Sequence, residues 1–183
     1  MPSAQTVRVR IRWKGRALDY RPPRFHELDV MPESGAPFGR KGRQILGAWL
    51  QLAGRDTAGM ILLDGDVAID PLDLAAMNHA IATDPAAVHV APVRNWSVST
   101  ARGEWEWGHW PFGTEPGQEL RTAGRFSFGF TYLPRTMFDR GRGPSGWDSW
   151  HYPWCDRNAS ELARRLRLAV HLVPGCHPKH LHY

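Results

Sequence analysis

The 183-residue chain has few cysteines, only three lysines and no long apolar run. No stretch approaches the roughly 20 apolar residues that a membrane-spanning helix needs, and MPSAQTVRVR at the start lacks the apolar core of a secretory signal. We therefore expect a cytoplasmic protein without a membrane span. The two cysteines, Cys155 and Cys176, lack metal-ligand or redox spacing. Reduced, partly buried thiols are the favoured interpretation, and a single disulfide is the alternative.

Composition and charge indicate one globular domain with an uneven charge distribution. The content of 42% hydrophobic and 22% charged residues is ordinary for a globular protein, and the length suits a single domain over residues 1–183. Residues 1–50 carry ten Lys or Arg against four acids, a net +6, so the total of +5 leaves −1 for residues 51–183. This basic N-terminal third indicates an anionic partner or, with equal weight, a solvated basic face.

Hydrophobic patterns predict an alternation of strands and helices. Strands are expected at residues 7–13, 60–63, 88–93, 126–133 and 170–173, and helices at 43–52, from Asp70-Pro71 onward, and at 157–168. The proline-broken region 15–40 and two tryptophan-rich segments, 94–122 and 141–154, are expected to be loops. The order predicts a single-domain α/β fold with a mixed, largely parallel sheet flanked by helices.

The segment GMILLDGDVAIDP, residues 59–71, places two carboxylates at the end of an apolar strand. Asp64 and Asp66 lie where ligands bind in open α/β sheets, beyond the carboxyl ends of the strands. Carboxylates are suitable ligands for Mg²⁺ or Mn²⁺. The alternative is a hairpin turn at Asp64-Gly65, although the helix start at Asp70-Pro71 leaves its second arm very short.

The longer segment GMILLDGDVAIDPLDLAAM resembles the Asp-x-Asp segment of nucleotide-sugar glycosyltransferases with the glycosyltransferase-A fold. The preceding helix at 43–52 and the segment FSFGFTYLPRTMF, residues 126–138, are also placed as in that family, and the resemblance covers roughly residues 40–182. It implies a short member of the family, with the glycosyltransferase-A-like fold. It also implies that Asp66, with Asp64, binds a divalent metal on the diphosphate of the sugar nucleotide.

The same resemblance implies a general base and a further metal ligand. Asp156, in PWCDRNASELARRLRL, corresponds to the family's catalytic base, with Asp148 in GWDSWHY as the rival; Asp156 is equally readable as a helix cap. The ending VPGCHPKHLHY resembles the family's Pro…His pattern, so His180 or His182 is expected to complete the metal site. The alternative is a surface histidine cluster.

Two further groups are candidate binding residues. Seven of the nine tryptophans lie between residues 96 and 154, and flat indole faces stack on sugars and on nucleobases. An acceptor platform is the favoured interpretation and a minor core the alternative; the candidates are Trp107, Trp110, Trp147, Trp150 and Trp154. Arg40, Lys41 and Arg43, at the start of a helix, are placed to contact the donor diphosphate, or else lie in a solvated turn.

The expected function is that of a metal-dependent, hexosyltransferase-like enzyme. It would use Mn²⁺ or Mg²⁺ and a nucleotide-diphosphate sugar, and transfer the sugar to an acceptor hydroxyl with inversion. The acceptor is open: DNA with modified bases, as for some phage enzymes, in which case the location is the host cytoplasm, or a protein or small molecule. Two alternatives stay open, a haloacid-dehalogenase-type phosphatase with Asp64 as nucleophile and a nucleic-acid-binding module without catalysis.

Overall fold

The computed structural model describes residues 5–13, 24–30, 41–99, 104–110, 126, 128–143, 145–150 and 155–180. For residues 13, 93–99, 104–110 and 180 it describes the backbone. In the described part of the chain, no helix is both long enough and apolar enough to cross a membrane.

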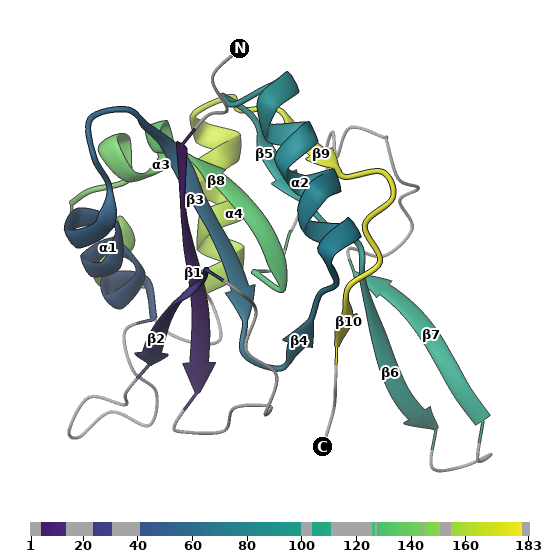
Figure 1. The fold of residues 1–183 in the computed structure, drawn as a ribbon. Helices are drawn as coiled ribbons and strands as arrows, with labels where there is room; N and C mark the ends of the chain where they lie inside the picture. The colour runs from purple at the N-terminus through teal and green to yellow at the C-terminus, as the bar shows by residue number, and fades with distance from the viewer. Residues whose placement is uncertain are drawn as a thin grey trace.

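A six-stranded sheet with the order β2-β1-β3-β8-β5-β9 forms the centre of the molecule (Figure 1). Its strands are parallel except for β8, which runs antiparallel to both β3 and β5. The predicted mixed, largely parallel α/β fold is therefore confirmed. The strands are β1 (Gln5–Trp13), β2 (His26–Val30), β3 (Thr57–Asp64), β5 (Val88–Val90), β8 (Phe130–Pro134) and β9 (Val170–Leu172).

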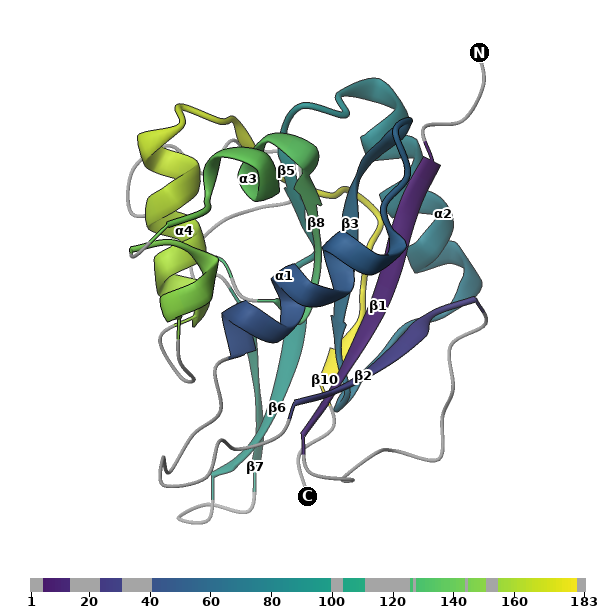
Figure 2. The same ribbon diagram turned by 90° about the vertical axis from the view of Figure 1, so that its left-hand side faces the viewer.

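Helices cover both faces of this sheet (Figure 2). The helices α1 (Lys41–Leu52), α3 (Arg135–Arg140) and α4 (Cys155–Arg165) lie on one face, and α2 (Pro71–Thr83) lies on the other. Alternate residues of β3 serve the two cores: Met60 and Leu62 pack on the α1 side, and Ile61 and Leu63 on the α2 side. A strand covered on both faces is apolar throughout, which explains the run at 60–63.

A second, four-stranded sheet has the order β4-β10-β6-β7. Its strands are β4 (Val67–Ala68), β10 (Lys179–His180), β6 (Val93–Ser99) and β7 (Glu104–Trp110). The pair β6–β7 is antiparallel and extends away from the main sheet (Figure 1). The prediction of a loop over 94–122 is therefore wrong for the part that forms these two strands, because tryptophan and glycine obscured a weak period-two pattern.

The region 15–40, also predicted to be a loop, contributes β2 to the edge of the main sheet. β2 pairs in parallel with β1, with Val9 opposite His26 and Trp13 opposite Val30. Its sequence, HELDV, has one buried residue, Val30. A short and largely polar edge strand of this kind carries little hydrophobic pattern, so the sequence did not reveal it.

The start of α2 follows the predicted capping chemistry. The carboxylate of Asp70 accepts hydrogen bonds from the backbone N–H groups of Leu72 and Asp73 at 2.7 and 2.9 Å. Asp73 reciprocates by accepting the Asp70 N–H at 3.0 Å, which completes a capping box before Pro71 at the first helical position. This cap fixes the helix directly behind the acidic turn.

Candidate functional site

The acidic segment forms the end of β3 and a tight turn, and not a hairpin. Asp64 is the last residue of β3, and its N–H donates to the carbonyl of Gly129 at 3.0 Å. After Gly65 and Asp66 the chain enters β4, which pairs with β10 instead of returning along β3. The carboxylates therefore lie at the carboxyl edge of the main sheet, as predicted.

Lys41 joins two carboxylates that are 92 residues apart in the chain. Its ammonium Nζ lies 3.1 Å from Asp64 Oδ1 and 3.9 Å from Asp156 Oδ1. Lys41 is the first residue of α1 and is 6% exposed, and Asp156 lies in the first turn of α4. The amino ends of two helices and the carboxyl end of β3 therefore meet at one charged cluster: Lys41, Asp64 and Asp156.

The surroundings of Asp156 hold its carboxylate in place. Oδ2 accepts the backbone N–H of Phe128 at 3.3 Å, and the carbonyl of Asp156 accepts the Ser160 hydroxyl at 2.9 Å. The Phe128 ring lies under the ammonium of Lys41, with Nζ 5.2 Å from the ring centroid. Asp156 lies in the first turn of α4, where its carboxylate also interacts with its own backbone N–H, and it is close enough to Asp64 for the two charges to influence each other.

Burial and charge act in opposite directions in this cluster. Burial is the largest influence on the pKa of Asp156 and raises it to about 6; the Lys41 ammonium opposes this rise and the Asp64 carboxylate adds to it. Burial alone would lower the pKa of Lys41, but Asp64 and Asp156 outweigh it, so that pKa is raised. Lys41 is consequently charged at neutral pH, and Asp156 takes up a proton at mild acidity.

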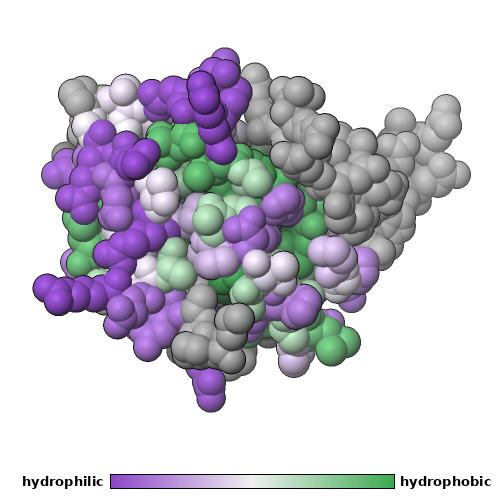
Figure 3. All heavy atoms as spheres, turned by 90° about the horizontal axis from the view of Figure 1, so that it is seen from above, coloured by the Kyte–Doolittle hydropathy of each residue, from purple (hydrophilic) through white to green (hydrophobic). Residues whose placement is uncertain are grey.

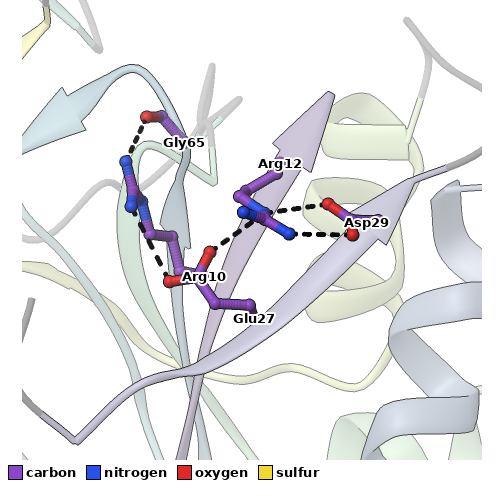
Figure 4. A network of polar contacts seen from close by, with 5 residues as sticks. All are labelled: Arg10, Arg12, Glu27, Asp29 and Gly65. Atoms are coloured by element: carbon purple, nitrogen blue, oxygen red, sulfur yellow. Dashed lines mark hydrogen bonds and ion pairs between the residues drawn. The ribbon is translucent and has the colours of Figure 1, made fainter. Parts of the chain in front are cut away.

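Arg10 supports the acidic turn from the other face of the sheet (Figure 4). Its side chain is fully buried, Nη2 donates to the carbonyl of Gly65 at 2.8 Å, and Nη1 lies 3.7 Å from Glu27. A β-carbon at Gly65 would lie 2.7 Å from the carbonyl oxygen of Ile11. The glycine therefore allows the turn to approach β1.

The basic N-terminal region is largely engaged within the protein. Arg12 makes two hydrogen bonds of 2.8 Å to the Asp29 carboxylate and lies 3.1 Å from Glu27 (Figure 4). Arg10 and Lys41 are buried and paired as described above. These three cations therefore do not form the free basic face that the charge count allowed. Arg43 is exposed on α1, and Arg40 lies outside the described residues.

The structure describes the backbone position of one of the two predicted histidine ligands. β10 pairs antiparallel with β4, so that the backbone of His180 lies opposite Val67, the residue after Asp66. His182 lies outside the described residues. Within the residues that the structure describes, no group of three or more His, Cys, Asp or Glu is arranged to hold a metal ion.

Two of the predicted acceptor tryptophans are core residues. Trp147 and Trp150 are 0% and 2% exposed, and Trp147 stacks on Phe138 with ring centroids 5.0 Å apart. The interpretation of these two indoles as a stacking platform is therefore wrong, and the minor-core alternative holds, because the glycine-rich segment around them folds back over α1 and α3. Trp107 and Trp110 lie on β7, where the structure describes the backbone, and Trp154 lies outside the described residues.

Two other predicted features have clear locations. Asp148 is exposed in a short 3₁₀ helix, Trp147–Ser149, and is not part of the charged cluster around Lys41. Cys155 and Cys176 are both buried free thiols, in agreement with the favoured interpretation.

Sequence reasoning missed the roles of Lys41 and Arg10. Lys41 was placed near a diphosphate, and no pattern indicated that its charge neutralises Asp64 and Asp156. Arg10 belongs to the strand predicted at residues 7–13, and no pattern indicated that its side chain is buried. A signal was available in hindsight only for Lys41: it is one of three lysines and stands at the start of a helix whose apolar face is buried.

Comparisons with known proteins assign no family to the chain. No protein-family model and no curated protein matches the chain. Among solved structures, the crystal structure of A197 from STIV superposes with a TM-score of 0.48 and 14% sequence identity, covering 91% of this chain and 81% of that one. A likeness at this level assigns neither a family nor an activity.

Proposed function

We propose that the protein is a metal-dependent glycosyltransferase that moves a sugar from a nucleotide-diphosphate donor to an acceptor hydroxyl. One observation carries the proposal: Asp64 at the carboxyl end of β3 and Asp156 at the start of α4 converge on Lys41. The convergence joins the Asp-x-Asp carboxylates to the aspartate that the resemblance implies as general base. It lies at the sheet edge where α/β proteins bind their ligands.

The residues present suit Mg²⁺ or Mn²⁺. Asp64 and Asp66 supply hard oxygen ligands from one turn, and the charges of Asp64 and Asp156 together exceed the single charge of Lys41 by one. Mg²⁺ is typically held by one or two protein carboxylates together with substrate phosphates and water. The absence of a cluster of three protein ligands in the described residues is compatible with such a site. His180, opposite Val67 on β10, is the further candidate ligand.

A bound divalent cation would neutralise charge on the nucleotide diphosphate as it leaves. The chain itself supplies the base. Asp156 accepts the proton of the acceptor hydroxyl as that oxygen attacks the anomeric carbon of the sugar, and the nucleotide diphosphate departs from the opposite side. Its raised pKa makes this carboxylate a stronger proton acceptor than an ordinary aspartate. The Phe128 N–H and Lys41 fix the orientation of its two oxygens.

The test begins with a thermal-shift screen of nucleotide sugars with and without Mn²⁺, because a ligand bound to the folded state alone raises the melting temperature. The donor found in this way is then used to measure sugar hydrolysis or transfer. Asp66→Asn should abolish the metal-dependent shift, and Asp156→Asn should lower turnover at least 100-fold with donor binding retained. Asp56→Asn, at an exposed position before β3, is the matched control. Full turnover in Asp156→Asn would refute the assigned base, and a donor shift that survives Asp66→Asn would refute the assigned metal site.

A phosphatase is the second candidate, favoured by the 3.1 Å contact between Lys41 Nζ and Asp64 Oδ1. A lysine in that position would orient an aspartate nucleophile toward a phosphate. Release of inorganic phosphate from p-nitrophenyl phosphate, lost in Asp64→Asn and accompanied by no nucleotide-sugar binding, would favour this activity over glycosyl transfer.

A further inference from the structure

A small hollow lies at the opposite end of α4 from Asp156, between the last turn of that helix and the segment that follows α3. Its volume is about 150 Å³. Its polar lining comes from Arg140, Arg142, Ser145 and Arg165, with Leu162 and Leu166 forming an apolar wall. On the face of the molecule seen from above in Figure 3, hydrophilic side chains surround a hydrophobic patch. Three arginines therefore line a single concavity of small-molecule size.

These arginines differ from their neighbours in making no close side-chain contact with a carboxylate within the part of the chain that the structure describes, although the charge of Arg165 acts on Glu161 one turn earlier in α4. Arg140, Arg142 and Arg165 make no ion pair or hydrogen bond through their side chains there. By contrast, Arg135 on α3 lies 3.2 Å from Asp139, and Arg164 on α4 lies 2.6 Å from Glu161. The guanidinium groups that line the hollow therefore keep hydrogen-bond donors that no described residue uses.

The segment that forms one wall is fixed by its own hydrogen bonds. The N–H groups of Gly146 and Trp147 donate to the carbonyls of Gly143 and Gly141, both at 2.9 Å, and the Trp147 indole N–H donates to Met137 O at 2.9 Å. A β-carbon at Gly146 would lie 1.9 Å from the Gly141 carbonyl oxygen. The wall is therefore built before any ligand arrives, which reduces the entropic cost of binding.

The local charge is positive even after the helix ends are counted. α3 and α4 both end at the hollow, and a helix carboxyl end carries roughly half a negative charge. The three positive charges of the guanidinium groups are larger than the roughly one negative charge of the two helix ends together. Across residues 135–167 there are seven arginines against four acidic residues, a net +3, whereas residues 51–134 and 168–183 together carry −4. The electrostatic potential therefore favours an anion.

We propose that this hollow binds a phosphate group. Guanidinium groups form paired hydrogen bonds with the oxygens of a phosphate, and a serine hydroxyl beside them adds a further donor. Arg165 follows Asp156 by nine residues on α4, a separation of roughly 14 Å along the helix axis. The hollow is therefore distinct from the proposed diphosphate site and does not depend on the proposed activity.

Isothermal titration with inorganic phosphate tests this assignment. The unmodified protein should bind phosphate saturably, and Arg140→Gln/Arg165→Gln should weaken binding at least tenfold. The control is Arg55→Gln/Arg164→Gln, which removes the same two charges from exposed positions outside the hollow and should leave the affinity unchanged. No saturable binding, or equal weakening in both double variants, would overturn the proposal.

Two additional experiments distinguish the hollow from the carboxylate site, and a phosphodiester ligand from a free phosphate. If Asp64→Asn/Asp66→Asn still binds phosphate, the phosphate site lies away from these carboxylates, and this proposal stands even if the proposed function fails. Loss of phosphate binding in that variant would overturn the hollow as the site. A short single-stranded oligonucleotide that displaces phosphate from both the unmodified protein and the control variant would assign a phosphodiester. Phosphate binding that the oligonucleotide leaves intact would assign a free phosphate or monoester, and both of these outcomes support the hollow.

Discussion

Two buried cations flank the turn after β3, one on each face of the sheet, and they are held in different ways. Lys41, on the α1 face, contacts the carboxylates of Asp64 and Asp156. Arg10, on the α2 face, donates to the backbone carbonyl of Gly65 and lies near one carboxylate, Glu27 (Figure 4). Lys41 therefore sets the charge of the candidate site, whereas Arg10 sets the path of the backbone that carries it.

The difference indicates which parts of the site can respond to a ligand. Asp64 and Asp156 are 24% and 30% exposed at their side chains, so their carboxylates reach solvent beside a buried ammonium. Gly65 is buried against the backbone of β1, the strand that also carries Arg10. We infer that a ligand would rearrange the charged cluster around Lys41 and leave the turn itself in place.

Replacing Lys41 should have the largest effect on stability. Lys41→Met removes the cation between two partly buried carboxylates, and breaking a buried pair in this way costs about 3–5 kcal/mol. Because both carboxylates keep some contact with water, we expect the lower part of this range, about 3 kcal/mol. Urea denaturation at pH 7 measures the free energy of unfolding.

The double variant Lys41→Met/Asp64→Asn provides the control for this prediction. It removes one of the two uncompensated charges, so it should recover at least half of the lost stability. Lys41→Arg, which keeps the charge, should be milder than Lys41→Met. If the double variant were no more stable than Lys41→Met, the loss would come from packing against Phe128 and not from the carboxylates.

Replacing Arg10 should produce a smaller loss of a different kind. Arg10→Met leaves the Gly65 carbonyl without its donor, and an unsatisfied buried acceptor costs about 1–3 kcal/mol. The matched change Arg12→Met, on the same strand and face but at the solvent edge, should cost less. Hydrogen exchange should show faster opening of the turn at residues 64–68 in Arg10→Met alone. Equal exchange in the two variants would mean that Arg10 does not hold the turn.

Apolar periodicity and caps predicted most of the fold, because they are local. The run at 60–63, the Asp70-Pro71 helix start and the arginine-rich helix at 157–168 all correspond to observed elements, with α4 beginning two residues earlier at Cys155. The strands β2, β6 and β7 were missed, because a polar edge strand and a tryptophan-rich hairpin carry little hydrophobic alternation. The carboxyl edge of the sheet was correctly expected to hold Asp64.

The partners of Asp64 could not be predicted, because they depend on contacts between distant parts of the chain. Lys41 precedes it by 23 residues and Asp156 follows it by 92, and no spacing rule connects three such positions. The tryptophans show the opposite problem. Trp147 looked available for stacking because glycine and proline surround it, yet those residues allow the segment to pack its indole into the core.

The titration of Asp156 should give a stability change of intermediate size on the Lys41 face. Burial raises its pKa from the ordinary value of 3.8 to about 6 in the folded state, so the folded protein binds a proton more tightly than the unfolded chain. Its contribution is fully present below pH 3.8 and is lost as the pH rises through about 6. The free energy of unfolding, measured from pH 4 to pH 7, should therefore contain a falling component of about 1–2 kcal/mol, reduced by solvent contact. Asp156→Asn should remove this component; an unchanged profile would place the titration elsewhere.

The smallest effect is expected behind the Arg10 face, at the start of α2. Asp70→Ala removes the two capping hydrogen bonds to Leu72 and Asp73, at a cost of about 1 kcal/mol. Since Asp70 is exposed and belongs to the scaffold side of the turn, donor or metal binding by the carboxylates at Asp64 and Asp66 should be unchanged. Thermal melts and metal titrations on the same variant measure both quantities. A loss of metal affinity that matched the loss of stability would show that the two faces are coupled through the turn, and the division between a charged site and a separate scaffold would then fail.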